Sequence, residues 1–82
     1  MLLLDMPKRV TPTAFPARLV ALRKERGLSQ QALATAVDVH VNQVRRYEAG
    51  RSQPTLDVLR GLAQALRVSI DGLVFDAADR GP

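Results

Sequence analysis

The sequence predicts an all-α protein built as one small domain. No segment alternates apolar and polar residues over the length of a strand, and no turn dipeptide separates two β-branched runs. Several segments instead repeat apolar residues every three or four positions, between residues that commonly cap or end helices. A chain of 82 residues has room for one domain with a thin core.

A first helix is predicted over residues 16–26. Pro16 suits a first helical turn, and Gly27 suits the left-handed residue that ends many helices. Leu28 follows this cap, where an apolar contact commonly closes the helix end. The stripe expected to face inward comprises Phe15, Leu19, Leu22 and Arg26.

A second, short helix is predicted over residues 30–37. Ser29 is a natural N-cap, because its hydroxyl can accept a hydrogen bond from a free amide of the first turn. Asp38 and Val39 then form a tight turn. The apolar residues expected to face inward are Leu33, Ala34 and Val37.

A third helix is predicted over residues 41–49 and ends at Gly50. Val44 and Tyr47 are its expected inward residues, so its outward face carries amide and guanidinium groups. Two short helices joined by a tight turn, the second with such a polar face, are typical of a helix-turn-helix. The second helix of that motif enters the major groove of DNA.

Two further helices are expected to complete the domain. Thr55 follows Pro54 and caps the fourth helix, with Asp57 near the positive end of the helix dipole. Ser69 caps a short fifth helix. The inward residues of the two helices are Leu59, Leu62, Ala63, Leu66, Ile70, Leu73 and Val74.

The distribution of charge and the residues that begin and end helices indicate three regions of the chain. Residues 1–14 form a flexible arm, residues 15–75 form the helical domain, and residues 76–82 form a loose acidic tail. The net charge is +4 and most of the basic residues precede the tail. A basic body of this kind suits a polyanion partner such as nucleic acid.

The composition argues against several other classes of protein. The chain has no cysteine, which rules out a disulfide framework or thiolate metal site and suits a cytoplasmic location. Its single histidine, His40, cannot build a metal cluster, and no apolar run approaches the length of a membrane span. No catalytic constellation or glycine-rich phosphate loop is present, so we expect neither enzymatic activity nor a cofactor.

Four stretches carry the motifs of a known family. Residues 18–34 read Arg-Leu-Val-Ala-Leu-Arg-Lys-Glu-Arg-Gly-Leu-Ser-Gln-Gln-Ala-Leu-Ala, residues 47–50 read Tyr-Glu-Ala-Gly, residues 54–57 read Pro-Thr-Leu-Asp, and residues 66–71 read Leu-Arg-Val-Ser-Ile-Asp. In these stretches the chain resembles the XRE/Cro-repressor-type helix-turn-helix family. The resemblance implies a five-helix, lambda-repressor-like DNA-binding domain, with the second and third helices as the helix-turn-helix.

The resemblance also implies roles for individual residues. Three residues of the third helix would contact base edges, namely Val41, Asn42 and Arg46. A larger set would bind the phosphates of the DNA backbone, namely Ser29, Gln30, Gln43, Arg45, Arg51, Ser52 and Gln53. Arg23 and Glu48 occupy the positions of a buried ion pair that ties the first helix to the third. No metal site is implied.

Three positions depart from the pattern of that family, and a fourth is unusual for a base-reading residue. Asp38 and Arg67 stand where glycine is usual, and a left-handed conformation costs more there than for glycine. His40 replaces the usual Ser or Thr cap, so the third helix is expected to be poorly capped. Val41 cannot hydrogen-bond a base edge and could only pack on a thymine methyl group.

The implied function is a sequence-specific regulator of transcription that binds double-stranded DNA, with repression as the expected outcome. Helix 41–49 would lie in the major groove. We expect a homodimer on DNA. It would form through the apolar residues of Ile70–Phe75 that exceed what the core needs. The alternative is an antitoxin-type autoregulator that also binds a protein toxin, and the neighbouring gene would distinguish the two.

Overall fold

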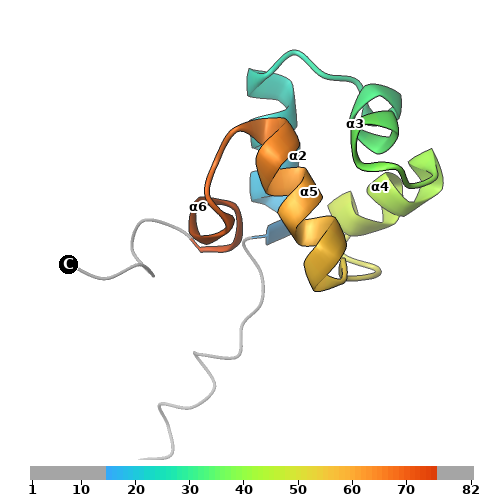
Figure 1. Cartoon of the computed structure of the whole chain (residues 1–82). Helices are drawn as coiled ribbons and strands as arrows, with labels where there is room; N and C mark the ends of the chain where they lie inside the picture. Colours follow the sequence, from blue (N-terminus) through green and yellow to red (C-terminus); the bar gives the residue numbers. More distant parts are fainter. Residues whose placement is uncertain (1–14, 76–82) are drawn as a thin grey trace, which may run out of the picture.

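The computed structural model describes residues 15–75, and this part of the chain contains five α-helices and no strand. They are α2 (Phe15–Glu25), α3 (Gln30–Val37), α4 (Val41–Glu48), α5 (Leu56–Leu66) and α6 (Ile70–Val74) (Figure 1). The all-α prediction is confirmed, and the predicted helix ends lie within about one residue of those observed. The expected arm over residues 1–14 and tail over residues 76–82 lie outside the described residues.

Polar side chains begin four of these helices. The hydroxyls of Ser29, Thr55 and Ser69 each accept a hydrogen bond from an amide of the first turn, as predicted. His40 does the same for α4, because its Nδ1 accepts a hydrogen bond from the Asn42 amide at 3.0 Å. The expectation of a poorly capped α4 is therefore wrong. The ring nitrogen replaces the usual hydroxyl oxygen as acceptor.

Two helices end on left-handed residues that are not glycine. Asp38 has φ of 60° after α3 and Arg67 has φ of 59° after α5, as the departures from the glycine pattern predicted. Their backbone amides donate to carbonyls of the preceding turn, so these helix ends are satisfied. A left-handed residue with a side chain costs about 1–2 kcal/mol, which the surrounding packing must offset.

A compact aliphatic core joins the helices. Its buried members are Leu19, Leu33, Ala34, Val44, Tyr47, Leu62, Ala63, Leu66 and Leu73. Arg26 does not belong to it, although it was expected on the inward stripe of α2. The Arg26 residue is exposed, and its guanidinium reaches across to donate to the Leu66 carbonyl at 2.7 Å. The long side chain thus satisfies the end of α5 instead of packing inside.

The helices pack in two groups, one at each end of the domain. At one end α4 packs against α2 and α3, and Figure 1 shows α3 and α4 side by side there. At the other end α6 packs against α2 and α5, and Arg18 of α2 donates from Nε to the Gly72 carbonyl of α6 at 3.0 Å. This arrangement leaves the outer side of α4 uncovered within residues 15–75.

Candidate nucleic-acid interface

The outer face of α4 carries exposed amide and guanidinium side chains. Val44 and Tyr47 are buried, and together they fix which side of the helix meets the core. Helical spacing then turns the intervening residues outward. The exposed residues on that side are Asn42, Arg45, Arg46 and Ala49.

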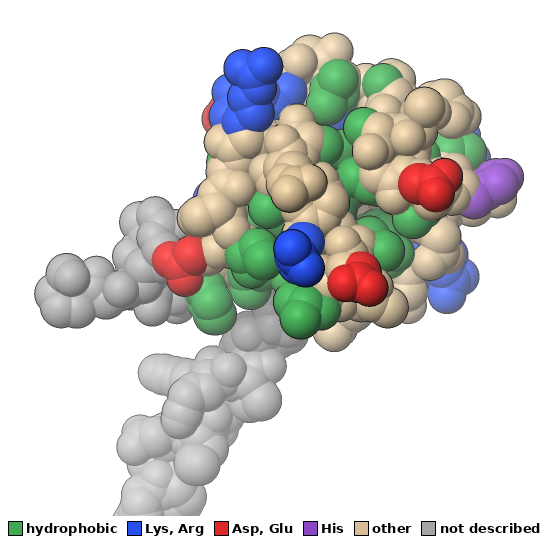
Figure 2. Space-filling view, viewed as in Figure 1, with side chains coloured by type: hydrophobic (Ala, Val, Ile, Leu, Met, Phe, Trp, Pro, Cys, Tyr) green, Lys and Arg blue, Asp and Glu red, His purple; other side chains and the backbone are tan. Residues whose placement is uncertain are grey.

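A shallow hollow lies on this outer face. It is lined by Asn42, Arg45, Arg46, Ala49 and Arg51, so three guanidinium groups surround it and no carboxylate does. By contrast, apolar, acidic and basic side chains are interspersed on the face seen in Figure 2. The hollow therefore favours an anionic partner. Ala49 is not among the residues predicted to contact DNA, although its helical spacing from residues 42, 45 and 46 places it on this face.

The two neighbouring arginines of α4 are held differently. Arg45 donates from Nη1 to the Asn42 Oδ1 at 2.8 Å, so these side chains lie together on the exposed surface. The Arg46 guanidinium makes no hydrogen bond or ion pair with the described residues. All of its N–H donors remain available to a ligand. The guanidinium can therefore form a bidentate hydrogen bond with two acceptors that lie in one plane.

The remaining residues predicted to contact DNA flank the hollow or lie apart from it. Val41 is half-buried and packs against the core, outside the lining of the hollow. Gln43 is half-buried and its Nε2 donates to the Tyr47 hydroxyl over a long 3.4 Å. In the loop to α5, Gln53 is exposed, whereas the Ser52 hydroxyl is buried without a hydrogen-bond partner among the described residues.

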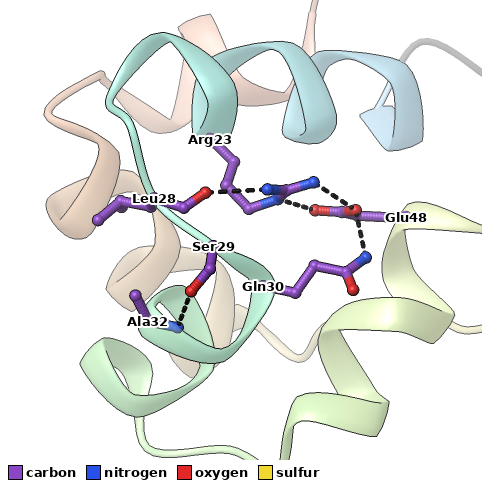
Figure 3. Close-up of polar contacts among 6 residues, drawn as sticks. All are labelled: Arg23, Leu28, Ser29, Gln30, Ala32 and Glu48. Atoms are coloured by element: carbon purple, nitrogen blue, oxygen red, sulfur yellow. Dashed lines mark hydrogen bonds and ion pairs between the residues drawn. The ribbon is translucent and has the colours of Figure 1, made fainter.

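The first turn of α3 lies beside the end of α4. Ser29 caps α3 by accepting from the Ala32 amide at 2.9 Å, and the next residue, Gln30, donates from Nε2 to the Glu48 Oε1 at 2.8 Å (Figure 3). The resemblance placed both residues at a phosphate contact, but no sequence signal indicated the bond to Glu48. That bond joins the helix end to α4.

The carboxylate of Glu48 also accepts from Arg23 of α2. The Arg23 Nε lies 2.6 Å from Glu48 Oε2, and its Nη2 lies 3.2 Å from Oε1, which makes a two-pronged pair. A third nitrogen, Nη1, donates to the Leu28 carbonyl at 2.9 Å (Figure 3). The two side chains are only 11% and 7% exposed. The ion pair that the resemblance implied is present in the structure.

Residues 15–75 contain neither a membrane-spanning helix nor a cluster of metal ligands. None of the described helices is long and apolar enough to cross a membrane. Within the same residues, no group of three histidine, cysteine or carboxylate side chains could hold a metal ion.

Comparison with known proteins identifies the family of this chain. The helix-turn-helix family HTH_3 matches residues 19–73. The cryptic phage CTXphi transcriptional repressor RstR of Vibrio cholerae is 35% identical over 63 residues, which are 77% of this chain and 57% of the repressor. The chain thus spans a little over half the length of that curated relative.

Solved structures agree with this assignment. The restriction-modification controller protein C.AhdI of Aeromonas hydrophila is 34% identical with a TM-score of 0.69, over 72% of this chain and 89% of the controller. The P22 c2 repressor, solved with a synthetic operator, is 30% identical with a TM-score of 0.71, over 73% and 91% of the two chains. The chain belongs to the HTH_3 helix-turn-helix family, the XRE/Cro-repressor type of DNA-binding transcriptional regulators.

Proposed function

We propose that this chain is a cytoplasmic, sequence-specific repressor of transcription that inserts α4 into the major groove of double-stranded DNA. The observation that carries the proposal is the outer face of α4, where three arginines and Asn42 surround one hollow while Val44 and Tyr47 anchor the opposite face. A rigid helix with such a face matches the way helix-turn-helix proteins read base edges. The similarity to two repressors supports repression as the outcome.

Base reading is assigned to three residues with different chemistry. Arg46 has unoccupied donors and would bind guanine through O6 and N7. Asn42 would contribute its amide to a neighbouring base, while Arg45 occupies its Oδ1 from the side. Val41 is half-buried and would offer an apolar contact to a thymine methyl group. Sequence preference should therefore centre on a guanine opposite Arg46.

Backbone contacts are assigned to the two sides of this reading helix. On one side, the capped first turn of α3, with Ser29 and Gln30, presents amides and the positive end of a helix dipole to a phosphate. On the other side, Gln43, Arg45 and the exposed loop residues Arg51 and Gln53 would bind sugar-phosphate atoms, whereas the Ser52 hydroxyl is buried. Such contacts orient the domain and raise affinity without selecting sequence.

A two-fold dimer on DNA is the expected assembly. One helix-turn-helix reads only a few base pairs, which is too little to find one site in a genome. The proposed surface spans Ile70–Phe75, where Phe75 is 45% exposed, Ile70 and Val74 are half-buried and Leu73 belongs to the core. Footprinting should give two half-sites about 34 Å apart. A single asymmetric half-site bound by one protein per duplex would contradict the dimer.

Selection of binding sites from random duplex DNA tests the proposal directly. The protein should enrich a two-fold symmetric sequence, and its affinity for that sequence should exceed its affinity for random DNA by about 10³-fold or more. A reporter gene placed behind the enriched site should lose expression when the protein is supplied. Failure to enrich any sequence, with binding that depends on salt alone, would show a non-specific polyanion binder instead.

A further inference from the structure

We propose that Glu48 is a positioning residue for DNA binding, which orients the side-chain amide of Gln30 so that an N–H group faces the phosphate. The proposal rests on the function proposed above. It assigns Glu48 a task at the interface besides its pairing with Arg23. The carboxylate does not itself contact DNA in this account, since its negative charge would repel a phosphate.

The direction of the Gln30 amide follows from the chemistry of its partner. A carboxylate paired with a guanidinium is ionised and only accepts hydrogen bonds. The group that faces Glu48 Oε1 at 2.8 Å must therefore be the NH₂ end of Gln30, not its carbonyl oxygen. Because an NH₂ group has two hydrogens, one binds Glu48 and the second is left for another acceptor.

This orientation matters because an amide has two unlike ends. Without a fixed neighbour, Gln30 could rotate and turn Oε1 toward the phosphate, where two acceptors would repel each other. The bond to Glu48 anchors the donor end at the first turn of α3, beside the helix amides that would bind the same phosphate. Glu48 thereby removes an unproductive orientation before DNA arrives.

Arg23 holds Glu48 in the place that this task requires. Its Nε and Nη2 bind both carboxylate oxygens, and its Nη1 binds the Leu28 carbonyl, which directly precedes the Ser29 cap. The guanidinium therefore fixes the end of α4 and the approach to α3 at once (Figure 3). It also neutralises a carboxylate that would otherwise stand near the phosphate as an unpaired negative charge.

A double-mutant cycle separates positioning from simple structural support. Glu48→Gln keeps the size of the side chain but presents both an oxygen and an NH₂ group, so Gln30 loses its enforced orientation. Affinity for a random duplex should fall about two- to fivefold in the native background and stay unchanged in the Gln30→Ala background. An equal loss in both backgrounds would show only a structural role and overturn the proposal. Gln31→Ala, which removes an exposed amide bonded to Thr35 at 3.2 Å, serves as the matched control and should bind like the native protein.

A measurement on the unaltered protein keeps the proposal testable if Glu48→Gln does not fold. In nuclear magnetic resonance spectra, one of the two side-chain NH₂ protons of Gln30 should already be shifted downfield without DNA, because it binds Glu48. The second proton should shift when a duplex is added. Binding that leaves the second proton unmoved would overturn the positioning role but leave the proposed function intact. Absence of any binding to the duplex would refute the proposed function itself.

Discussion

Breaking the buried ion pair between Arg23 and Glu48 should strongly destabilise this small domain, and Glu48→Ala tests this expectation. The substitution removes both acceptors of a two-pronged pair with N–O distances of 2.6 and 3.2 Å. The Arg23 side chain is 11% exposed in the native structure, and the substitution leaves its guanidinium with only the Leu28 carbonyl as acceptor. Removing one partner of such a buried pair costs about 3–5 kcal/mol, because the remaining charge is uncompensated.

That cost is large against the stability of the domain. Residues 15–75 should unfold with a free energy of roughly 3–9 kcal/mol, at about 0.05–0.15 kcal/mol per residue. A domain of this size loses about 4–8 °C of Tm for each kcal/mol, so Glu48→Ala should melt roughly 12–40 °C lower. Thermal unfolding followed by circular dichroism measures this directly.

Two variants make the result interpretable. Glu25→Ala removes the same side chain from an exposed position and should change the unfolding free energy by less than about 0.5 kcal/mol. Replacing Arg23 with Met in the Glu48→Ala protein should recover part of the loss, because no unpaired charge is then buried. A Glu48→Ala protein that melts within a few degrees of the native chain would refute the reasoning.

The remaining predictions concern the interface and the start of α4. Arg46→Ala should cost about 1–3 kcal/mol on the selected site and relax preference at one base pair, as measured by competition with substituted duplexes; equal losses on selected and random DNA would show a phosphate contact. Gln30→Ala should weaken binding to all sequences by about 1 kcal/mol in titrations, and a changed sequence preference would contradict an anchoring role. His40→Ala should lower the unfolding free energy by about 0.5–2 kcal/mol whereas His40→Ser should keep it, and equal stability of the two variants in denaturant would show that the cap contributes nothing.

Much of the fold could be predicted because local signals agreed with one another. Ser29, Thr55 and Ser69 begin helices at the predicted places, and apolar residues at helical spacing then supply the buried positions. The capping by His40 could not be predicted from residue preferences, because those preferences count hydroxyl and carboxylate acceptors rather than a ring nitrogen. Arg26 was misplaced because spacing alone does not say whether a long side chain packs or reaches past the core.

The interface was harder to predict from the sequence, since some of its contacts join residues of different helices. The hollow draws on α4 and on Arg51 beyond it, and the bond from Gln30 to Glu48 crosses between helices. Periodicity can say that Asn42, Arg45 and Ala49 share a face. It cannot say which donor of Gln30 faces which oxygen, because that depends on how α3 and α4 are packed.

A substitution of Glu48 should change both the stability of the domain and its DNA binding, whereas a substitution of Arg46 should change DNA binding alone. Glu48 accepts hydrogen bonds from both Arg23 and Gln30, so a change that displaces its carboxylate should alter both the contact between α2 and α4 and the proposed phosphate contact of Gln30. The Arg46 guanidinium makes no hydrogen bond or ion pair within residues 15–75, so truncating this side chain should change affinity at nearly constant Tm. The affinity measured for Glu48→Ala must therefore be divided by the folded fraction before the change is attributed to DNA binding. The corresponding loss on Arg46→Ala can be read directly.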